Sequence, residues 1–296
     1  MPAVRGSVAS PAQYAFWIKW ATRASVATAL ILIVAKLAAW FYSGSASLLA
    51  SLTDSMMDAM ASMVNFYALR VALVPADSDH RFGHGKAEPL ATLVQSGFIL
   101  GSALLLLFHG VERVLSPQLL ERSALGIGVT LFAIVMTLAL LALQRRAVAI
   151  TGSSAIAADA LHYRSDLLLN AAVLLALVLA GMGVLWADGV FAVLIALYIG
   201  YGAWGLGHEA VQLLLDREAD PEVRQRVVAL VQHDPQVRGY HDLRTRLSGN
   251  RLCVQLHLEL DGALTLLQAH GVADAVEQRI RTEFPGADVI VHEDPV

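Results

Sequence analysis

Two pairs of ionisable residues lie inside long apolar stretches of the chain. Asp54 and Asp58 are four residues apart in SLTDSMMDAMASM, and His162 and Asp166 are four residues apart in ADALHYRSDLLLN. In a helix, four-residue spacing places both side chains on one face, about 6 Å apart. Two such helices could therefore offer three carboxylates and one imidazole to a single divalent cation, and Zn²⁺, Cd²⁺ or Fe²⁺ would suit such a site.

Ionisable groups at membrane depth are costly, at about 2.5–3.5 kcal/mol each, so they are rarely without a function. The simpler alternative is that these acids lie near helix ends or bond to neighbouring helices. The two matched pairs favour an intramembrane metal site. Because its ligands must lose protons before they bind metal, metal and H⁺ compete, which is a sufficient basis for antiport. Asp159, one turn before His162, could orient the imidazole ring or could be a polar residue near a helix start.

The composition is that of a membrane protein with one polar appendage. Hydrophobic residues make up 56% of the 296 residues, charged residues make up 16%, and the mean hydropathy is +0.58. Six segments are long and apolar enough to predict spanning helices: about 22–42, 47–73, 88–115, 123–147, 154–182 and 187–214. We therefore expect an N-terminal cytoplasmic segment (1–21), a six-helix transmembrane domain (22–216) and a C-terminal soluble domain (217–296). The first apolar run is too long for a cleavable signal peptide.

Positive charges gather in alternate loops, which predicts that both termini are cytoplasmic. The residues concerned are Arg5, Lys19, Arg23, Arg70, Arg81, Lys86, Arg145, Arg146 and Arg217, whereas the opposite loops hold little beyond Arg113 and Arg122. A net charge of −4 without a basic, aromatic-rich stretch gives no sign of nucleic-acid binding. The single cysteine, Cys253, excludes an internal disulfide framework and a cysteine-rich metal cage.

The soluble segment predicts a two-layer α+β fold with the order α-β-β-α-β. Asp220 and Pro221 suit the N-cap and first position of a helix. A hairpin is expected around Ser248-Gly249-Asn250, because apolar residues alternate strictly from Leu252 to Leu260. A helix over about 264–284 and a strand through ADVIVHED complete the order.

Two further clusters could bind metal. Asp77, His80 and His84 lie within PADSDHRFGHGKAE, although a solvated polar loop would explain them as well. The same loop does not match the phosphate-binding Walker pattern, so ATP is not indicated. The soluble segment holds five of the ten histidines with a nearby carboxylate, which favours metal over isolated surface or core histidines. These candidates are His241, His257, His270, His292 and Asp294. His257 should face away from the leucines, whereas His241 shares strand parity with Leu243 and Leu247.

With these motifs laid out, the chain resembles the cation diffusion facilitator family over nearly its whole length after about residue 12. The most specific stretches are the two intramembrane pairs, PADSDHRFGHGKAE, HDLRTR, LLQAH and DVIVHEDP. The resemblance implies a homodimer in the bacterial inner membrane that exchanges cytoplasmic divalent metal for protons, with six spanning helices and a metallochaperone-like cytoplasmic domain. It assigns transport to Asp54, Asp58, His162 and Asp166, a loop site to Asp77, His80 and His84, and a binuclear cytoplasmic site to His241, His257, His270, His292 and Asp294.

The resemblance also implies that Lys86 and Asp216 form a charge interlock near the dimer contact and that Leu161 gates the pathway. Glu293, next to Asp294, leaves the surroundings of the cytoplasmic site open. Two other classes compete with a proton-coupled transporter. A metal-gated channel or sensor would use the same acids and histidines without proton coupling. An intramembrane metallohydrolase would need an open metal position and a general base, and no HExxH motif occurs, so an enzyme is not expected.

Overall fold

The computed structural model describes residues 9–44, 46–116, 124–184 and 186–296. Arg5, Arg122 and the predicted start of the fourth apolar segment at 123 lie outside these residues. The chain divides into two compact units. The helical unit comprises Trp17–Val71 and Ala87–Val211. The mixed unit comprises the chain up to Phe16, Ala72–Lys86 and Gln212–Val296.

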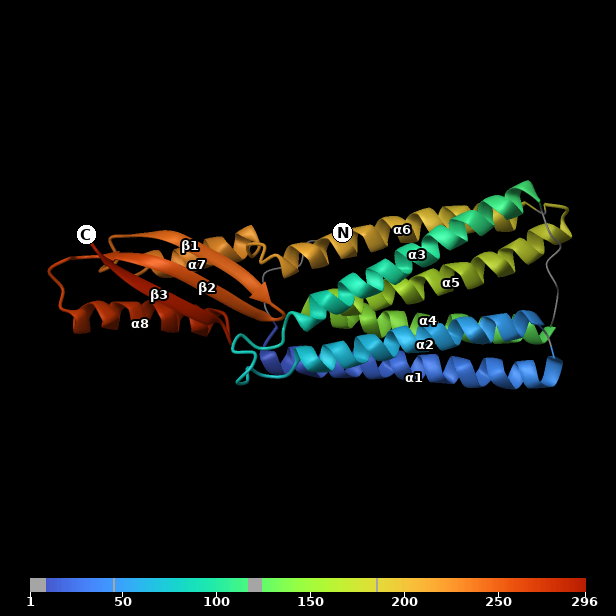
Figure 1. The fold of residues 1–296 in the computed structure, drawn as a ribbon, viewed down its shortest axis with the longest axis horizontal. Helices are drawn as coiled ribbons and strands as arrows, with labels where there is room; N and C mark the ends of the chain where they lie inside the picture. Colours follow the sequence, from blue (N-terminus) through green and yellow to red (C-terminus); the bar gives the residue numbers. More distant parts are fainter. Residues whose placement is uncertain (1–8, 45, 117–123, 185) are drawn as a thin grey trace. The chain divides into compact units, whose positions relative to one another are not determined.

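Six long helices run through the first two-thirds of the sequence (Figure 1). They are α1 (Pro11–Ser43), α2 (Ala46–Ala72), α3 (Ala87–Leu115), α4 (Ala124–Thr151), α5 (Ser154–Gly181) and α6 (Ala187–Leu214). Five of them are long and apolar enough to cross a membrane; α2, which carries Asp54, Asp58 and several serines, is not among these five. The predicted boundaries hold within a few residues except at α1, which begins at Pro11 instead of about 22. Lys19 and Arg23 lower the hydropathy of this first part without interrupting the helix.

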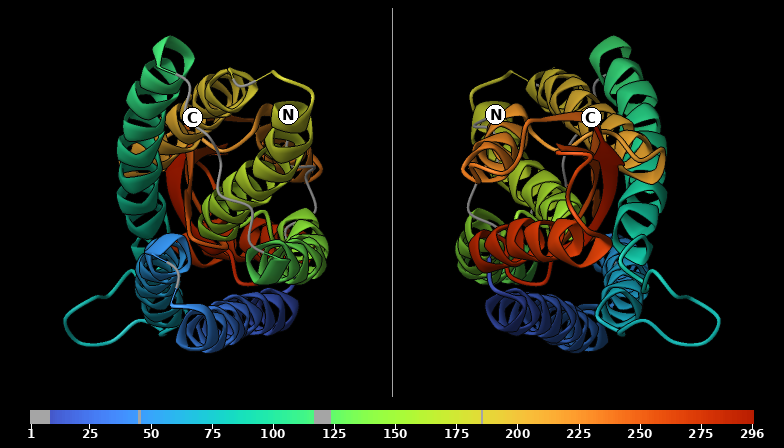
Figure 2. Two further views of the ribbon diagram at one scale, coloured as in Figure 1. Left: turned by 90° about the vertical axis from the view of Figure 1, so that its right-hand side faces the viewer. Right: turned by 90° about the vertical axis from the view of Figure 1, so that its left-hand side faces the viewer.

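The helices of the helical unit run roughly along one direction, as their end-on view shows (Figure 2). Small residues allow α3 and α6 to approach closely. A Cβ added at Gly189 would lie 2.6 Å from the backbone nitrogen of Val114, and one at Gly110 would lie 3.0 Å from Val193. Close backbone approach at small residues is a usual means of helix packing in membranes, where the hydrophobic effect does not drive helices together.

The mixed unit contains the predicted α-β-β-α-β fold. Its elements are α7 (Pro221–Gln232), β1 (Gly239–Ser248), β2 (Arg251–Leu260), α8 (Leu266–Glu283) and β3 (Asp288–Pro295). In the sheet, β2 lies between an antiparallel β1 and a parallel β3. The alternating apolar residues of β2 pack with Val227 of α7 and Val276 of α8 in one buried core, so both helices cover the same face of the sheet.

Local signals explain where these helices begin. Thr265 caps α8 in a reciprocal capping box with Gln268, which satisfies two of the free amides at the helix start. Asp220 occupies the N-cap of α7 and Pro221 follows it, as predicted, but the Asp220 side chain makes no capping hydrogen bond. The preset φ of proline therefore contributes more to this helix start than the aspartate side chain.

A β-bulge in β1 overturns the predicted orientation of His241. Thr245 and Leu247 pair with Val254 and Leu252 on the core side, but the register shifts between His241 and Arg244. Beyond the shift His241 pairs with His257, on the face opposite the core. One extra residue in a strand reverses the alternation of side chains, so counting from Leu243 and Leu247 gave the wrong face.

Candidate metal sites

The two intramembrane pairs converge between α2 and α5. His162 Nε2 lies 3.0 Å from Asp58 Oδ1 and 3.8 Å from Asp166 Oδ2. One ligand atom from each of these residues lies within 4.8 Å of the others, and all three side chains are partly buried. Asp54, one turn earlier on α2, lies outside this group and is more exposed. The structure therefore brings together three of the four residues predicted to hold the transported ion.

Asp159 connects helices instead of supporting His162 by a hydrogen bond. It is buried, with 3% of its surface exposed, and accepts hydrogen bonds from Ser25 of α1, Gln95 of α3 and Gln144 of α4. The Gln144 bond measures 2.7 Å. Because α5 also carries His162, this network fixes the helix that presents the imidazole. Neither the two glutamines nor Ser25 stood out in the sequence, because single polar residues in apolar runs form no motif.

Leu161, the residue implied as a gate, packs between helices of the helical unit. It is buried together with Ile99 of α3 and with Ile199 and Ala203 of α6. A Cβ added at Gly202 would lie only 3.0 Å from Leu161 Cδ2. Leu161 thus occupies space that the missing side chain of Gly202 leaves open.

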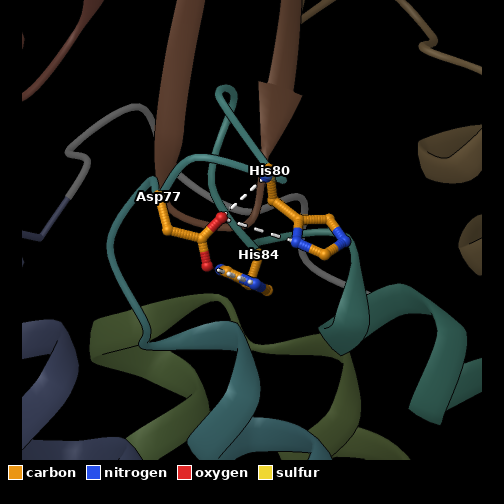
Figure 3. Close-up of side chains that lie close together, drawn as sticks. All are labelled: Asp77, His80 and His84. Atoms are coloured by element: carbon orange, nitrogen blue, oxygen red, sulfur yellow. Dashed lines mark hydrogen bonds and ion pairs between the residues drawn. The ribbon is translucent and has the colours of Figure 1, made fainter.

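The loop between α2 and α3 brings its three predicted residues together (Figure 3). Asp77 Oδ2 lies 3.5 Å from His84 Nε2, and Asp77 Oδ1 lies 3.6 Å from His80 Nδ1. The backbone amide of His80 donates to Asp77 at 2.7 Å, and this bond holds the pKa of the Asp77 carboxyl below its usual range. The loop therefore presents an ionised carboxylate between two imidazoles.

Lys86 and Asp216, which the family resemblance pairs, belong to an ionic network of three residues that also includes Arg246. Lys86 Nζ lies 3.0 Å from Asp216 Oδ1, and Arg246 Nη1 lies 3.1 Å from the same oxygen. Partial burial acts to raise the pKa of Asp216, but the hydrogen bond from Lys86 and the charge of Arg246 outweigh it, so the pKa lies below its ordinary value. Asp216 has a φ of 58°, a left-handed conformation that aspartate tolerates better than most residues. Arg246 ends the HDLRTR stretch, but no sequence pattern pairs it with Asp216.

Four of the five predicted cytoplasmic residues lie together on the outer face of the sheet. His257 Nδ1 lies 2.7 Å from Asp294 Oδ2, and His241 Nε2 lies 3.2 Å from the same oxygen. His292 joins at the edge, with its Nε2 3.4 Å from Asp294 Oδ1. The hydrogen bond from His257 lowers the pKa of Asp294. The bulge in β1 makes this group possible, because it turns His241 toward His257.

His270 lies apart from this group. It projects from α8, on the opposite side of the sheet, and its closest carboxylates are Asp274 at 3.5 Å and Glu293 at 3.6 Å. A cluster of ligand atoms that includes His270 does not occur among the residues the structure describes. His270 and the other four predicted ligands therefore lie on opposite sides of the sheet, and the binuclear arrangement that the family resemblance implies stays a prediction.

The fold and the sites define a multi-pass membrane protein with cation-binding groups in its helices and in an appended α+β domain. Comparison with known proteins gives the same class. Residues 22–215 match the cation efflux transmembrane domain, and residues 219–296 match the cytoplasmic domain of cation efflux proteins. The chain belongs to the cation efflux family, the cation diffusion facilitators, as its motifs indicated.

Its relatives include several bacterial proteins named cation-efflux pump FieF. The protein from Shewanella oneidensis is 60% identical, and the match covers 96% of each chain. That from Pectobacterium atrosepticum is 50% identical over 96% of this chain and 94% of the relative. That from Serratia proteamaculans has the same identity and coverage. The chain is accordingly a cation efflux transporter of the membrane, and the prediction that it is not an enzyme is confirmed.

Proposed function

We propose that this protein exports a divalent metal, Zn²⁺ foremost and also Cd²⁺ or Fe²⁺, from the cytoplasm of a bacterium across the inner membrane in exchange for protons. The observation that carries the proposal is the convergence of Asp58, His162 and Asp166 between two helices of the helical unit. One imidazole and carboxylate oxygens form a ligand set that suits these metals. Asp54 completes the set as the fourth ligand.

Proton exchange follows from the geometry of the ligand atoms. His162 Nε2 and Asp58 Oδ1 are 3.0 Å apart, which is a hydrogen-bond distance, and we infer that they share a proton when no metal is bound. Tetrahedral Zn²⁺ with bonds of about 2.0–2.1 Å needs its ligand atoms at about 3.3 Å from one another. The two atoms that share the proton are therefore already spaced to share a metal, and the proton must leave when the metal binds.

The loop and the outer face of the sheet supply two further metal sites in this proposal. Asp77, His80 and His84 hold one ion, and the histidines around Asp294 hold metal in the cytoplasmic domain. Neither cluster contains a residue of α2 or α5, so we assign them to regulation and not to the passage of the ion. The protein acts as a homodimer, with Lys86 and Asp216 near the dimer contact and Leu161 as the gate beside His162. Both chain termini lie in the cytoplasm.

Reconstituted vesicles test the transport site and the coupling together. The wild-type protein should accumulate Zn²⁺ against its gradient when a pH step is applied, and it should move protons in the opposite direction. His162→Ala and Asp58→Ala should abolish this flux. His109→Ala is the matched control, because His109 is also a histidine of a membrane helix but bonds to the backbone of its own helix at Leu105. A Zn²⁺ flux that does not change with the pH step would contradict antiport and favour a metal-gated channel.

A further inference from the structure

A lysine of α1 approaches the transport site from a third helix. Lys36 is half-buried, and its Nζ donates to Ser55 Oγ at 2.6 Å and to the backbone oxygen of Ser51 at 3.1 Å. Ser55 is the neighbour of Asp54 and lies less than one turn from Asp58 on α2. A charged amine within apolar helices is costly and usually marks function. The transport ligands identified above do not account for it.

The neutral oxygens hold the ammonium beside the carboxylates without pairing it with one of them. Ser51 and Ser55 flank Asp54 on α2, so the amine is held beside the stretch of helix that carries Asp54 and Asp58. Within the described part of the chain, the hydrogen bonds of Lys36 nevertheless go to the two serines alone. Contacts with α2 thus fix the position of the Lys36 charge, which can interact with all the carboxylates of the transport site and is not paired with a single one.

We propose that Lys36 is a specificity-determining residue, a tethered positive charge that matches the transport site to divalent cations. This inference rests on the proposed transport function. With His162 neutral, as a metal ligand must be, the ionised Asp54, Asp58 and Asp166 carry three negative charges, and the Lys36 ammonium balances one of them. A divalent ion neutralises that remainder, whereas a monovalent ion leaves one uncompensated charge in a medium where charge is expensive.

The same charge limits how tightly the ion is held. A transporter must release its substrate, and a site with three uncompensated carboxylates would retain a divalent ion too strongly. The repulsion between the ammonium and the bound metal lowers the affinity toward a value that permits release. Removal of the charge should therefore tighten binding and slow turnover, the opposite of what loss of a ligand does.

The test measures Zn²⁺ affinity at a fixed pH of 7 in the full-length protein. His84→Ala and His257→Ala are included as the background, so that calorimetry reports the membrane site. Lys36→Gln, which keeps a hydrogen-bond donor but removes the charge, should tighten binding by about tenfold or more, given the strength of charge interactions at low effective dielectric. Lys36→Arg should stay within threefold of the background protein. Lys19→Gln, an exposed lysine of the same helix, is the matched control and should have no effect.

Two further measurements keep the result unambiguous. Ser55→Ala removes the Oγ contact and leaves the charge, so its affinity should change less than that of Lys36→Gln; an equal change would assign the effect to the hydrogen bond and overturn the inference. Where Lys36→Gln is not monodisperse, Lys36→Met serves as the uncharged variant. Unchanged affinity of the uncharged variants would also refute the role of Lys36. Absence of Zn²⁺ binding in the background protein itself would instead refute the proposed transport site.

Discussion

The contact between the α2–α3 loop and the β1–β2 turn depends on Gly85. A Cβ added there would lie 2.5 Å from the backbone oxygen of Ser248 and 2.9 Å from the backbone nitrogen of Gly249. Ordinary contact begins at 3.4 Å, and a backbone atom cannot rotate away as a side chain can. Gly85→Ala must therefore displace the loop from the turn by about 1 Å. His84 and Lys86 flank this position, so both the loop site and the charge interlock should loosen.

The expected cost is that of inserting a methyl group into a packed contact, about 1–3 kcal/mol. That cost corresponds to an increase of about 5- to 150-fold in the population of the undocked loop. Hydrogen–deuterium exchange should show it as faster exchange in residues 76–86 and in the β1–β2 turn. Zn²⁺ binding to the loop should weaken in parallel, because His84 moves relative to Asp77.

Gly271→Ala in α8 is the control for this substitution. It makes the same chemical change in the same unit, but a Cβ at Gly271 meets nothing within 4 Å. The alanine should stabilise the helix slightly, by about 0.5–1 kcal/mol. Equal exchange rates for Gly85→Ala and the wild-type protein, with the control behaving as expected, would refute the reasoning.

Three further predictions follow from the other contacts. Asp216→Asn should lower the melting temperature at pH 7. Because folding lowers the pKa of Asp216, the difference in melting temperature between the variant and the wild-type protein should be lost as the pH falls from about 4 through the lowered pKa. A difference in melting temperature that does not depend on pH would contradict the ionic network. Asp159→Leu leaves three buried donors without their acceptor and should lower the free energy of unfolding by at least about 1–3 kcal/mol. An unchanged unfolding temperature in detergent would be evidence against this stabilising role of Asp159. His257→Ala should weaken metal binding to the cytoplasmic domain more than His270→Ala does, and calorimetry giving the reverse order would show that α8 holds the principal ligand.

Apolar length and the alternation of apolar residues sufficed to predict most of the helices and the strands. Five of the six long helices follow from length and hydropathy, α2 is less apolar because it carries Asp54, Asp58 and several serines, and the hairpin follows from the alternation between Leu252 and Leu260. The early start of α1 could not be predicted, because a hydropathy criterion detects segments that are apolar enough to span a membrane and does not detect helicity. Pro11 at the helix start is a weak signal by itself, since proline is equally common in turns.

The sites were predictable where spacing within one element defines them. The pairs Asp54/Asp58 and His162/Asp166 are of this kind, and the two helices bring most of their ligand atoms together. Contacts between elements could not be predicted in the same way. The partners of Asp159 lie on three other helices, and Arg246 reaches Asp216 from β1. Lys36 did leave a trace in the sequence, because it is a lone charge inside an apolar run.

The surroundings of the carboxylates suggest how the sites outside the helices differ from the transport site. Backbone amides and an imidazole keep the pKa values of Asp77 and Asp294 low, so these carboxylates stay ionised at neutral pH. In the proposed mechanism, the membrane site instead holds a proton between two ligand atoms, Asp58 Oδ1 and His162 Nε2, which lie 3.0 Å apart. On this proposal each binding event at the transport site must displace a proton, whereas the carboxylates of the loop and of the cytoplasmic domain have no proton to lose at neutral pH. In the proposed mechanism, this difference separates the regulatory sites from the site that exchanges metal for protons.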